Sequence, residues 1–442
     1  MMGATQTQRT ALVAGLGVSG RAALRYLAHA GWRVFATDRE ASRSVLAGAA
    51  WRAPERLDEV LGQSELMVIS PGVAPTWAPV TAARNRGIQI VSELELFARA
   101  ASSPIVAVTG TNGKTTVTSL VAEMARAAGL RVGLGGNIGT PALDLLDAQV
   151  DLYVLEVSSF QLESTYSLRS QAAVVLNLSA DHLDRHRDMS AYAAAKARIY
   201  DGARAMIVNR DDPRVMAMVG ADAAVVTFGL DAPQRDVDYG LVTDASGLSK
   251  WVRGKKALLK IEEANLKGRH NYLNVLAAWA LGAAVGLPDP AMAAAVRGFR
   301  SLPHRLDWVA ERCGVHYYDD SKATNVAAAV AALRSLRAPL VVIAGGEGKG
   351  QDFGDFAEIL VRRARAVVLI GRAAAVIETA LAGRIPCRRV RGMEQAVHAA
   401  AGFARRGDTV LLSPACSSLD MYRDYVARAR AFTRAVEDLP NG

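Results

Sequence analysis

A glycine-rich segment at residues 110–116, Gly-Thr-Asn-Gly-Lys-Thr-Thr, constrains the fold of this 442-residue chain more than any other feature. It follows an apolar run at 104–108 that is typical of a buried strand, and it precedes a pattern at 117–126 that predicts an amphipathic helix. Strand, glycine turn and helix in this order surround an anion with backbone N–H groups and a helix N-terminus. Lys114 adds a positive charge, and Thr115 or Thr116 offers a hydroxyl to Mg²⁺. The segment therefore predicts an α/β domain that binds a nucleoside triphosphate.

A second glycine pattern lies near the amino terminus. The run at 10–14 predicts a strand, Gly-Leu-Gly-Val-Ser-Gly follows at 15–20, and a second predicted strand at 33–37 ends at Asp38. This spacing is typical of dinucleotide-binding folds and favours a nicotinamide cofactor, so an NAD-dependent dehydrogenase is one hypothesis. The glycines require only that a phosphate or pyrophosphate approaches the first helix closely. A UDP-linked substrate satisfies the same geometry, and both interpretations stay open at this point.

Charged groups and an imidazole follow the central predicted strands. Residues 152–160 predict an apolar strand that contains Glu156, and a buried carboxylate must be paired or bind a metal. We favour the metal. The strand predicted at 173–178 leads to His182, at the edge where open α/β sheets hold their ligands, which favours a metal ligand over a core histidine. Between these segments, residues 133–139 are rich in glycine and predict a turn.

Lysine usage marks four further positions. Only nine of the 52 basic residues are lysine, and five of these lie together at 250–267, where they indicate a solvated surface. An ammonium is compact, can lose a proton and can be modified, whereas a guanidinium does none of these. The remaining lysines each stand in a motif-like segment and are candidate site residues: Lys114, Lys196, Lys322 and Lys349.

Composition limits the classes of binding partner and the cellular compartment that we expect for this protein. The net charge of +9 comes from basic residues interleaved with acidic ones, and aromatic residues make up only 6%, so a nucleic-acid-binding role has no support. Acidic small-molecule substrates explain the charge equally well. The uncharged run at 271–288 contains Asn271 and Asn274 and predicts a buried helix rather than a membrane span. Three scattered cysteines and a short polar amino terminus fit a cytoplasmic protein without membrane insertion.

The order of predicted elements indicates three α/β domains. Strands predicted at 315–318, 366–371 and 409–413, with a strand and glycine turn at 340–350, form a third alternating segment after the two already described. We expect a Rossmann-like amino-terminal domain at 1–97, a central ATP-binding domain of the phosphate-loop ATPase type at 98–302, and a Rossmann-like carboxyl-terminal domain at 303–442. Residues 98–103 are expected to be a linker.

Seven motifs occur together in a fixed order, at 110–116, 156–162, 181–184, 270–274, 303–305, 320–325 and 413–420. On these motifs the chain resembles the Mur ligases of peptidoglycan synthesis over essentially its whole length. Among the members of that family it is most similar to the ligase that adds D-glutamate to UDP-N-acetylmuramoyl-L-alanine. A sister ligase that uses L-glutamate or another amino acid is the alternative within the family.

The resemblance implies a reaction and its catalytic groups. In the family, ATP phosphorylates the carboxylate of the first substrate, and the amine of the amino acid then displaces phosphate from the acyl phosphate. Two Mg²⁺ sites are implied: Thr115 and Glu156 fall on one, and His182 falls on the other together with Lys196, which is carbamylated in this family. Lys114, Glu156, His182 and Lys196 are therefore the implied catalytic residues.

The resemblance also implies binding residues. The phosphates of ATP fall to Gly110, Thr111, Asn112, Gly113, Lys114, Thr115 and Thr116, the adenine to Asn271 and Asn274, and further nucleotide contacts to Arg305 and Asp320. The uridine diphosphate falls to Val18, Ser19, Asp38, Arg39 and Gly72, with Asn137 and Ser158 nearer the muramoyl end, and His182 is a further substrate-binding residue. The glutamate pocket falls to Lys322, Thr324, Lys349, Ser418 and Tyr425. The family places the nucleotide between its second and third domains, and the implied partners are these small molecules alone, bound by a monomer.

The chain departs from the family pattern near its carboxyl terminus. Tyr425 and Ala429 stand where the family usually has phenylalanine and glycine. Glu347 stands where aspartate is commoner. The added hydroxyl and methyl lie in the segment expected to contact glutamate, which keeps the L-glutamate alternative open.

Overall fold

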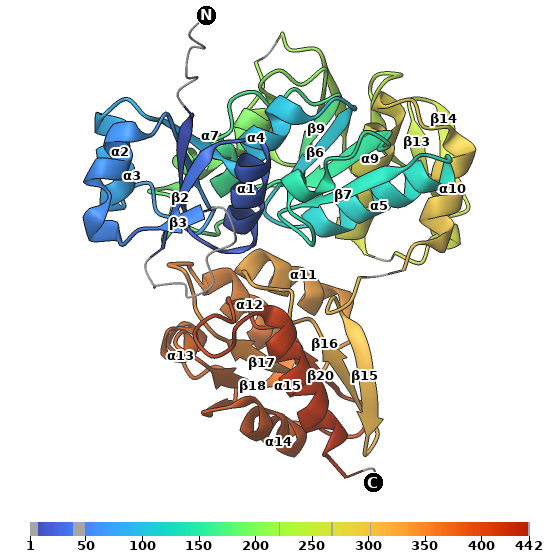
Figure 1. Ribbon diagram of the computed structural model, residues 1–442. Coiled ribbons are helices and arrows are strands. Elements are labelled where there is room, and N and C mark those ends of the chain that lie inside the picture. The colour runs from blue at the N-terminus through green and yellow to red at the C-terminus, as the bar shows by residue number, and fades with distance from the viewer. Residues whose placement is uncertain (1–7, 39–48, 221, 267, 301, 441–442) are drawn as a thin grey trace, which may run out of the picture. The chain divides into compact units, whose positions relative to one another are not determined.

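The computed structural model describes residues 8–38, 49–220, 222–266, 268–300 and 302–440 of the chain. These residues form two compact units (Figure 1). Unit 1 comprises residues up to 178 together with 190–299, and unit 2 comprises 179–189 together with the residues from 300 onward. Unit 1 contains two β-sheets and unit 2 contains one. Arg39, one of the expected uridine diphosphate contacts, lies outside the described residues.

The first sheet of unit 1 is parallel and has the strand order β3-β2-β1-β4-β5. The expected strands at 10–14 and 33–37 are confirmed. The strands are β1 (Thr10–Ala14), β2 (Arg33–Thr37), β3 (Ala49–Trp51), β4 (Leu66–Ile69) and β5 (Gln89–Ser92), and the helices are α1 (Val18–His29), η1 (Pro54–Arg56), α2 (Asp58–Gln63), α3 (Ala78–Asn85) and α4 (Glu93–Ala100). Because consecutive strands are parallel and joined by helices, this is a Rossmann-like arrangement.

The second sheet of unit 1 has nine strands in the order β14-β13-β12-β11-β10-β9-β6-β8-β7. It is parallel from β7 to β12, and an antiparallel meander of β13 and β14, which the sequence did not predict, extends one edge. The strands are β6 (Ile105–Thr109), β7 (Val132–Gly136), β8 (Leu152–Glu156), β9 (Ala172–Val175), β10 (Ala205–Asn209), β11 (Val225–Phe228), β12 (Tyr239–Thr243), β13 (Ser249–Arg253) and β14 (Lys256–Lys260). The helices are α5 (Lys114–Ala127), η2 (Ala142–Leu145), α6 (Ser159–Leu162), α7 (Met189–Ala197), η3 (Arg198–Tyr200), α8 (Pro213–Met216), η4 (Ile261–Glu263), α9 (Arg269–Ala284) and α10 (Asp289–Gly298).

Two local predictions near the glycine-rich segments were wrong. Residues 132–136 form the edge strand β7 rather than part of a turn, because Gly133 and Gly135 lie so close to neighbouring atoms that a Cβ would overlap the Tyr153 ring and the Thr140 carbonyl oxygen. Helix α5 begins at Lys114, three residues earlier than expected, since Gly113 adopts the left-handed conformation at its N-cap. The early start brings Lys114 into the first turn of the helix.

The uncharged run at 271–288 forms a helix, as expected. Helix α9 covers Arg269–Ala284 and buries its apolar residues from Val275 to Gly282 within unit 1. Among the residues that the structure describes, no helix combines the length and the apolar character needed to cross a membrane.

Helix α4 joins the two sheets of unit 1, and the linker expected at 98–103 is confirmed only at residues 101–103, which lie outside any helix or strand. The helix continues to Ala100, and the Phe97 ring packs edge-on against Tyr153 with the ring centroids 5.0 Å apart. Buried Glu93 accepts a hydrogen bond from the Leu143 N–H (2.6 Å), and buried Glu95 accepts hydrogen bonds from the Tyr166 and Ser167 N–H groups (2.7 and 2.9 Å). Burial raises the pKa of Glu93 to about 7. The connection is therefore a packed joint.

The sheet of unit 2 has the order β15-β16-β20-β17-β18-β19, with β15 antiparallel and the other strands parallel. Helices α11, α12 and α13 pack on one face of this sheet, and α14 and α15 pack on the other. The strands are β15 (Asp307–Arg312), β16 (Val315–Asp319), β17 (Leu340–Gly345), β18 (Ala364–Ile370), β19 (Cys387–Arg389) and β20 (Thr409–Leu412), and the helices are α11 (Val326–Ser335), α12 (Gly354–Arg363), α13 (Ala374–Leu381), α14 (Met393–Phe403) and α15 (Tyr425–Glu437). Unit 2 is thus a second Rossmann-like fold.

Candidate active site

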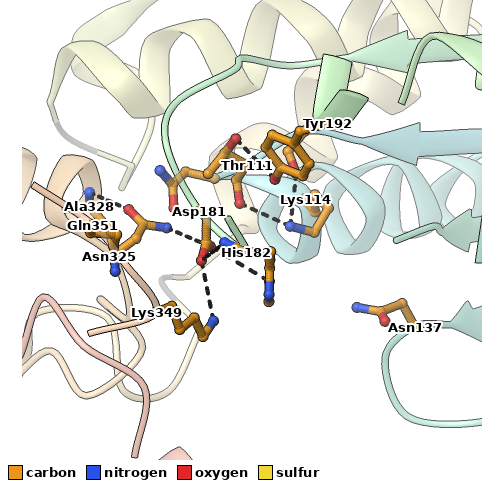
Figure 2. A network of polar contacts seen from close by, with 12 residues as sticks. Thr111, Lys114, Asn137, Asp181, His182, Tyr192, Asn325, Ala328, Lys349 and Gln351 are labelled. Atoms are coloured by element: carbon orange, nitrogen blue, oxygen red, sulfur yellow. Dashed lines mark hydrogen bonds and ion pairs between the residues drawn. The ribbon is translucent and has the colours of Figure 1, made fainter. Parts of the chain in front are cut away.

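The loop between β6 and α5 is held in shape by its own backbone and by Asn177. The Asn112 N–H donates to the Asn177 side-chain oxygen (2.8 Å), and the Asn177 amide donates back to the Asn112 carbonyl (3.0 Å). The Lys114 ammonium donates to the carbonyls of Gly110 and Thr111, both at 2.9 Å (Figure 2). A lysine therefore lies at the N-terminus of a helix, where a phosphate would also meet backbone N–H groups.

The two expected adenine contacts lie beside this loop on the first turns of α9. Asn274 donates from its amide to the Asn271 side-chain oxygen (3.2 Å). The Asn274 oxygen is so close to Gly113 that a Cβ at residue 113 would overlap it. Gly113 is therefore required both by its positive φ of 85° and by the space that Asn274 occupies.

Glu156 lies at the end of β8 and is only 2% exposed. Its carboxylate accepts one hydrogen bond from the Thr115 hydroxyl and one from the Asn137 amide, both at 2.8 Å. The structure thus brings three of the expected site residues together. Carboxylate and hydroxyl oxygens are ligands that Mg²⁺ prefers, so Thr115 and Glu156 fit the expected metal. Among the described residues, no group of three or more His, Cys, Asp and Glu side chains is arranged to hold a metal ion.

Lys196 on α7 is also 2% exposed and points at the phosphate loop. Its ammonium donates to the Gly110 carbonyl (2.9 Å) and the Thr109 hydroxyl (3.3 Å), and it lies 4.7 Å from the centroid of the Tyr192 ring. The Tyr192 hydroxyl is 3.3 Å from the Thr111 hydroxyl (Figure 2). Sequence reasoning missed Tyr192. The available signal was its position four residues before Lys196, which places both side chains on one face of the helix.

A pocket of about 320 Å³ lies at the carboxyl ends of β1, β2 and β4. Val18, Ser19, Asp38 and Gly72 all line it, so the four described members of the expected uridine diphosphate set lie together. Asp38 accepts a hydrogen bond from the Leu16 N–H (2.6 Å). Ser158, the remaining expected contact in unit 1, caps α6 by accepting a hydrogen bond from the Gln161 N–H (3.2 Å).

In unit 2, Asp181 is the centre of a polar network that includes His182 and Lys349. The Lys349 ammonium lies 3.2 Å from one carboxylate oxygen of Asp181, and the Asn325 amide donates to the other at 3.3 Å (Figure 2). The His182 Nε2 atom lies 3.7 Å from the same carboxylate. Asp181 belongs to the motif at 181–184, but the sequence analysis assigned it no role, because no local pattern links it to a lysine so distant along the chain.

Lys322 has a different set of neighbours from Lys349. Its ammonium lies 3.9 Å from the centroid of the Tyr425 ring. The His304 ring lies edge-on to Tyr425 with centroids 6.0 Å apart, and its Nδ1 atom is 2.7 Å from the Asp319 carboxylate. The other expected glutamate contacts, half-buried Thr324 and buried Ser418, lie on the loops that follow β16 and β20.

Asp320, an expected nucleotide contact, is buried at the end of β16. The Ser413 hydroxyl donates to its carboxylate (2.9 Å). Burial raises the pKa of Asp320 to about 7, against the opposing effects of the Ser413 hydrogen bond and the Arg305 charge. The structure therefore places Asp320 within the electrostatic influence of Arg305, the second expected nucleotide contact in unit 2.

Comparison with protein families accounts for most of the chain. Residues 9–92 match the Mur ligase MurD-like N-terminal domain, residues 108–282 match the Mur ligase middle domain, and residues 304–416 match the Mur ligase glutamate ligase domain. The three matches follow one another in the order of the three sheets. The fold is therefore a three-domain α/β fold with Rossmann-like domains at both ends.

Individual relatives and structures agree with these matches. Proteins named UDP-N-acetylmuramoylalanine--D-glutamate ligase from Nitrosococcus oceani and Methylobacillus flagellatus are 47% and 48% identical, over 98% and 97% of this chain and 98% and 96% of theirs. The UDP-N-acetylmuramate-alanine ligase of Thermotoga maritima and a pseudomurein peptide ligase of Methanothermus fervidus share the fold, each with a TM-score of 0.62, at 20% and 17% identity, over 97% of this chain and 99% of theirs. From the sequence motifs, the three domain matches and these relatives, we conclude that the chain belongs to the Mur ligase family.

Proposed function

We propose that this chain is an ATP-dependent ligase that joins D-glutamate to UDP-N-acetylmuramoyl-L-alanine in the synthesis of peptidoglycan precursors. The observation that supports the chemistry best is the gathering of Lys114, Thr115, Glu156 and Lys196 around one phosphate loop. The substrates are inferred from the relatives, which carry this activity in their names and match nearly the full length. The enzyme is proposed to be cytoplasmic and monomeric.

In the first proposed step, an oxygen of the alanyl carboxylate attacks the γ-phosphorus of ATP. A new P–O bond forms, the bond to the β–γ bridging oxygen breaks, and ADP leaves with that oxygen. Lys114 and the N–H groups at the start of α5 stabilise the negative charge of the transferring phosphoryl group, whereas the Thr111 and Asn112 N–H groups donate to Asn177. Mg²⁺ ions, held by Thr115 and Glu156 at one site and by His182 and carbamylated Lys196 at the other, would neutralise part of the same charge.

In the second proposed step, the amine of D-glutamate attacks the carbonyl carbon of the acyl phosphate. The nitrogen loses a proton, the tetrahedral intermediate collapses to an amide, and inorganic phosphate leaves. Glutamate carries two carboxylates, and Lys322 and Lys349 supply one ammonium for each in our proposal. Thr324 and Ser418 offer hydroxyl donors to the same groups, and Tyr425 packs beside Lys322.

The remaining residues are proposed to hold the two nucleotides. The amino-terminal pocket takes the uridine diphosphate through Val18, Ser19, Asp38 and Gly72. Asn137 and Ser158 contact the muramoyl end, Asn271 and Asn274 contact adenine, and Arg305 and Asp320 complete the ATP contacts. This assignment corresponds to the proposed division into a uridine-diphosphate-binding domain at 1–97, an ATP-binding domain at 98–302 and a glutamate-binding domain at 303–442.

The direct test is phosphate release by the purified protein with ATP, Mg²⁺ and UDP-N-acetylmuramoyl-L-alanine, with D-glutamate, L-glutamate or no amino acid added. Release that requires D-glutamate, together with a product whose mass corresponds to one added glutamate, is the expected result. Release that requires L-glutamate would transfer the proposal to a sister ligase, in which Tyr425 and Ala429 reshape the pocket. Binding of a nicotinamide cofactor with no phosphate release would instead revive the dehydrogenase hypothesis.

A further inference from the structure

The first turn of α15 organises both loops of unit 2 that carry predicted glutamate contacts. Arg428 is 1% exposed, and its guanidinium donates to the Cys416 carbonyl (3.0 Å) and the Ser321 carbonyl (2.8 Å). Ser321 immediately precedes Lys322, and Cys416 lies two residues before Ser418. The helix therefore fixes the backbone of both loops through one buried side chain.

Tyr425 lies three residues before Arg428, on the same face of α15. Its ring contacts the ammonium group of Lys322, in the loop that follows β16. Its backbone is fixed by the helix cap, and its ring is oriented by a neighbouring ring. The Asp424 side chain caps the helix by accepting a hydrogen bond from the Ala427 N–H (2.7 Å), and the His304 ring, itself hydrogen-bonded to Asp319, lies against the Tyr425 ring. A ring held in this way presents a defined face to Lys322.

An ammonium 3.9 Å from a ring centroid is within the range of a cation–π interaction. The attraction is electrostatic and depends on the negative face of the ring. It also restricts a side chain that otherwise samples many rotamers, and ordering such a side chain is a substantial cost of binding. A lysine that is already oriented therefore binds a carboxylate more tightly than a mobile one.

We propose that Tyr425 is a positioning residue that holds the Lys322 ammonium, through its ring face, for a carboxylate of the incoming amino acid. The inference rests on the proposed function and assigns a physical role to the aromatic ring, which Tyr425 shares with the phenylalanine usual at this position in the family. The hydroxyl of Tyr425 is not needed for this role, whereas the electron density of the ring is. That distinction makes the proposal testable.

Steady-state kinetics provide the first test. Tyr425→Leu should raise the KM for D-glutamate roughly two- to thirty-fold, the range of exposed to desolvated cation–π pairs, while kcat and the KM for ATP change by less than about twofold. Tyr425→Phe should restore a low KM. Tyr166→Leu is the matched control, because it removes an exposed ring 5.2 Å from the Arg198 guanidinium in unit 1. An unchanged KM for D-glutamate in Tyr425→Leu would overturn the proposal.

A fluorination series separates the ring face from simple packing. Phenylalanine with one, two and three ring fluorines at position 425 keeps the shape of the ring but progressively removes its negative face. The logarithm of the KM for D-glutamate should rise stepwise along this series. A flat series, together with a high KM in Tyr425→Leu, would show that the ring acts by packing alone and would overturn the cation–π role.

An NMR measurement tests the contact without relying on activity. The chain has only nine lysines, so ¹³Cε-lysine labelling gives a spectrum in which one ring-shifted resonance can be assigned to Lys322 by substitution. The shift should persist in Tyr425→Phe and disappear in Tyr425→Leu. Its absence from the wild type would overturn the inference while leaving the proposed reaction intact. A wild type that shows no turnover dependent on D-glutamate would overturn both.

Discussion

Two lysine–tyrosine pairs, one in each unit, show how differently the same contact can be built. Lys196 and Tyr192 are four residues apart on one helix, with the ammonium 4.7 Å from the ring centroid. Lys322 and Tyr425 are brought to 3.9 Å only by the fold of unit 2. The geometry of one helix therefore determines the first contact, and the tertiary packing of unit 2 determines the second.

The two ammoniums also differ in their access to ligands. Lys196 is 2% exposed and donates to the phosphate-loop carbonyl of Gly110, whereas Lys322 is half-buried at the edge of its sheet. A buried lysine held against a fixed loop suits a permanent part of the catalytic centre. A half-buried lysine held by a ring suits a substrate that arrives and leaves. Substitutions at the two pairs should therefore differ in the size and in the kind of their effects.

Replacing Lys196 should have the largest effect. We expect Lys196→Ala to lower kcat at least about 100-fold and Lys196→Arg to recover none of it, since a guanidinium cannot form a carbamate. Steady-state phosphate release measures the loss. Lys255→Ala, at an exposed position, is the control and should retain wild-type activity. High activity in either Lys196 variant would exclude the carbamate role and make Lys196 a structural partner of Gly110.

Removing the Tyr192 ring, which contacts the Lys196 ammonium, should lower the stability of unit 1. Tyr192 is 1% exposed, so Tyr192→Leu leaves a cavity and should lower the stability of unit 1 by about 2–4 kcal/mol. Tyr192→Phe keeps the ring but removes the hydroxyl, which contacts Thr111, and should cost about 1 kcal/mol. Hydrogen exchange of the amides in α7 and β6 measures both values. Equal losses in the two variants would mean that the hydroxyl matters more than the ring.

The stability of unit 2, which contains the Lys322–Tyr425 pair, should depend on pH through the buried carboxyl group of Asp320. Asp320 has a folded-state pKa of about 7, above its ordinary value of 3.8, so its favourable contribution is complete below pH 4 and is lost as the pH rises towards 7. We expect unit 2 to lose about 2–4 kcal/mol over this range. Asp320→Asn should flatten the dependence. Hydrogen exchange of β16 and β20 at several pH values tests this, and an equally steep dependence in the variant would assign the titration to another group.

The smallest effect is expected where a cation–ring pair is exposed to water. The Arg198 guanidinium lies 5.2 Å from the centroid of the Tyr166 ring, which is 58% exposed. Tyr166→Leu should change the stability of unit 1 by less than about 0.5 kcal/mol, because solvent screens such pairs. The Tyr166 N–H still donates to Glu95 in the variant. A loss above about 1 kcal/mol in thermal unfolding would show that burial is not what separates strong from weak pairs here.

The parts of the structure that follow from local patterns were predictable from the sequence. The strand before the phosphate loop and the burial of α9 follow from the hydrophobic pattern, and the gathering of Glu156 with Thr115 was implied by the family resemblance. The contact between Lys322 and Tyr425 and the network of Lys349 with Asp181 depend on tertiary packing, which no local pattern encodes. Strand β7 was missed because its glycines indicate a turn unless the neighbouring Tyr153 and Thr140 are known.

The packed joint at α4 limits how this protein can be dissected. A fragment ending at residue 97 would expose the apolar surface of Phe97 and leave the Glu93 and Glu95 carboxylates without the N–H donors that they bind in the whole chain. Such a fragment is expected to aggregate or to rearrange around the pocket at the ends of β1, β2 and β4. A screen for inhibitors of that pocket therefore needs the intact protein, because helix α4 of the same region is held by residues beyond position 97.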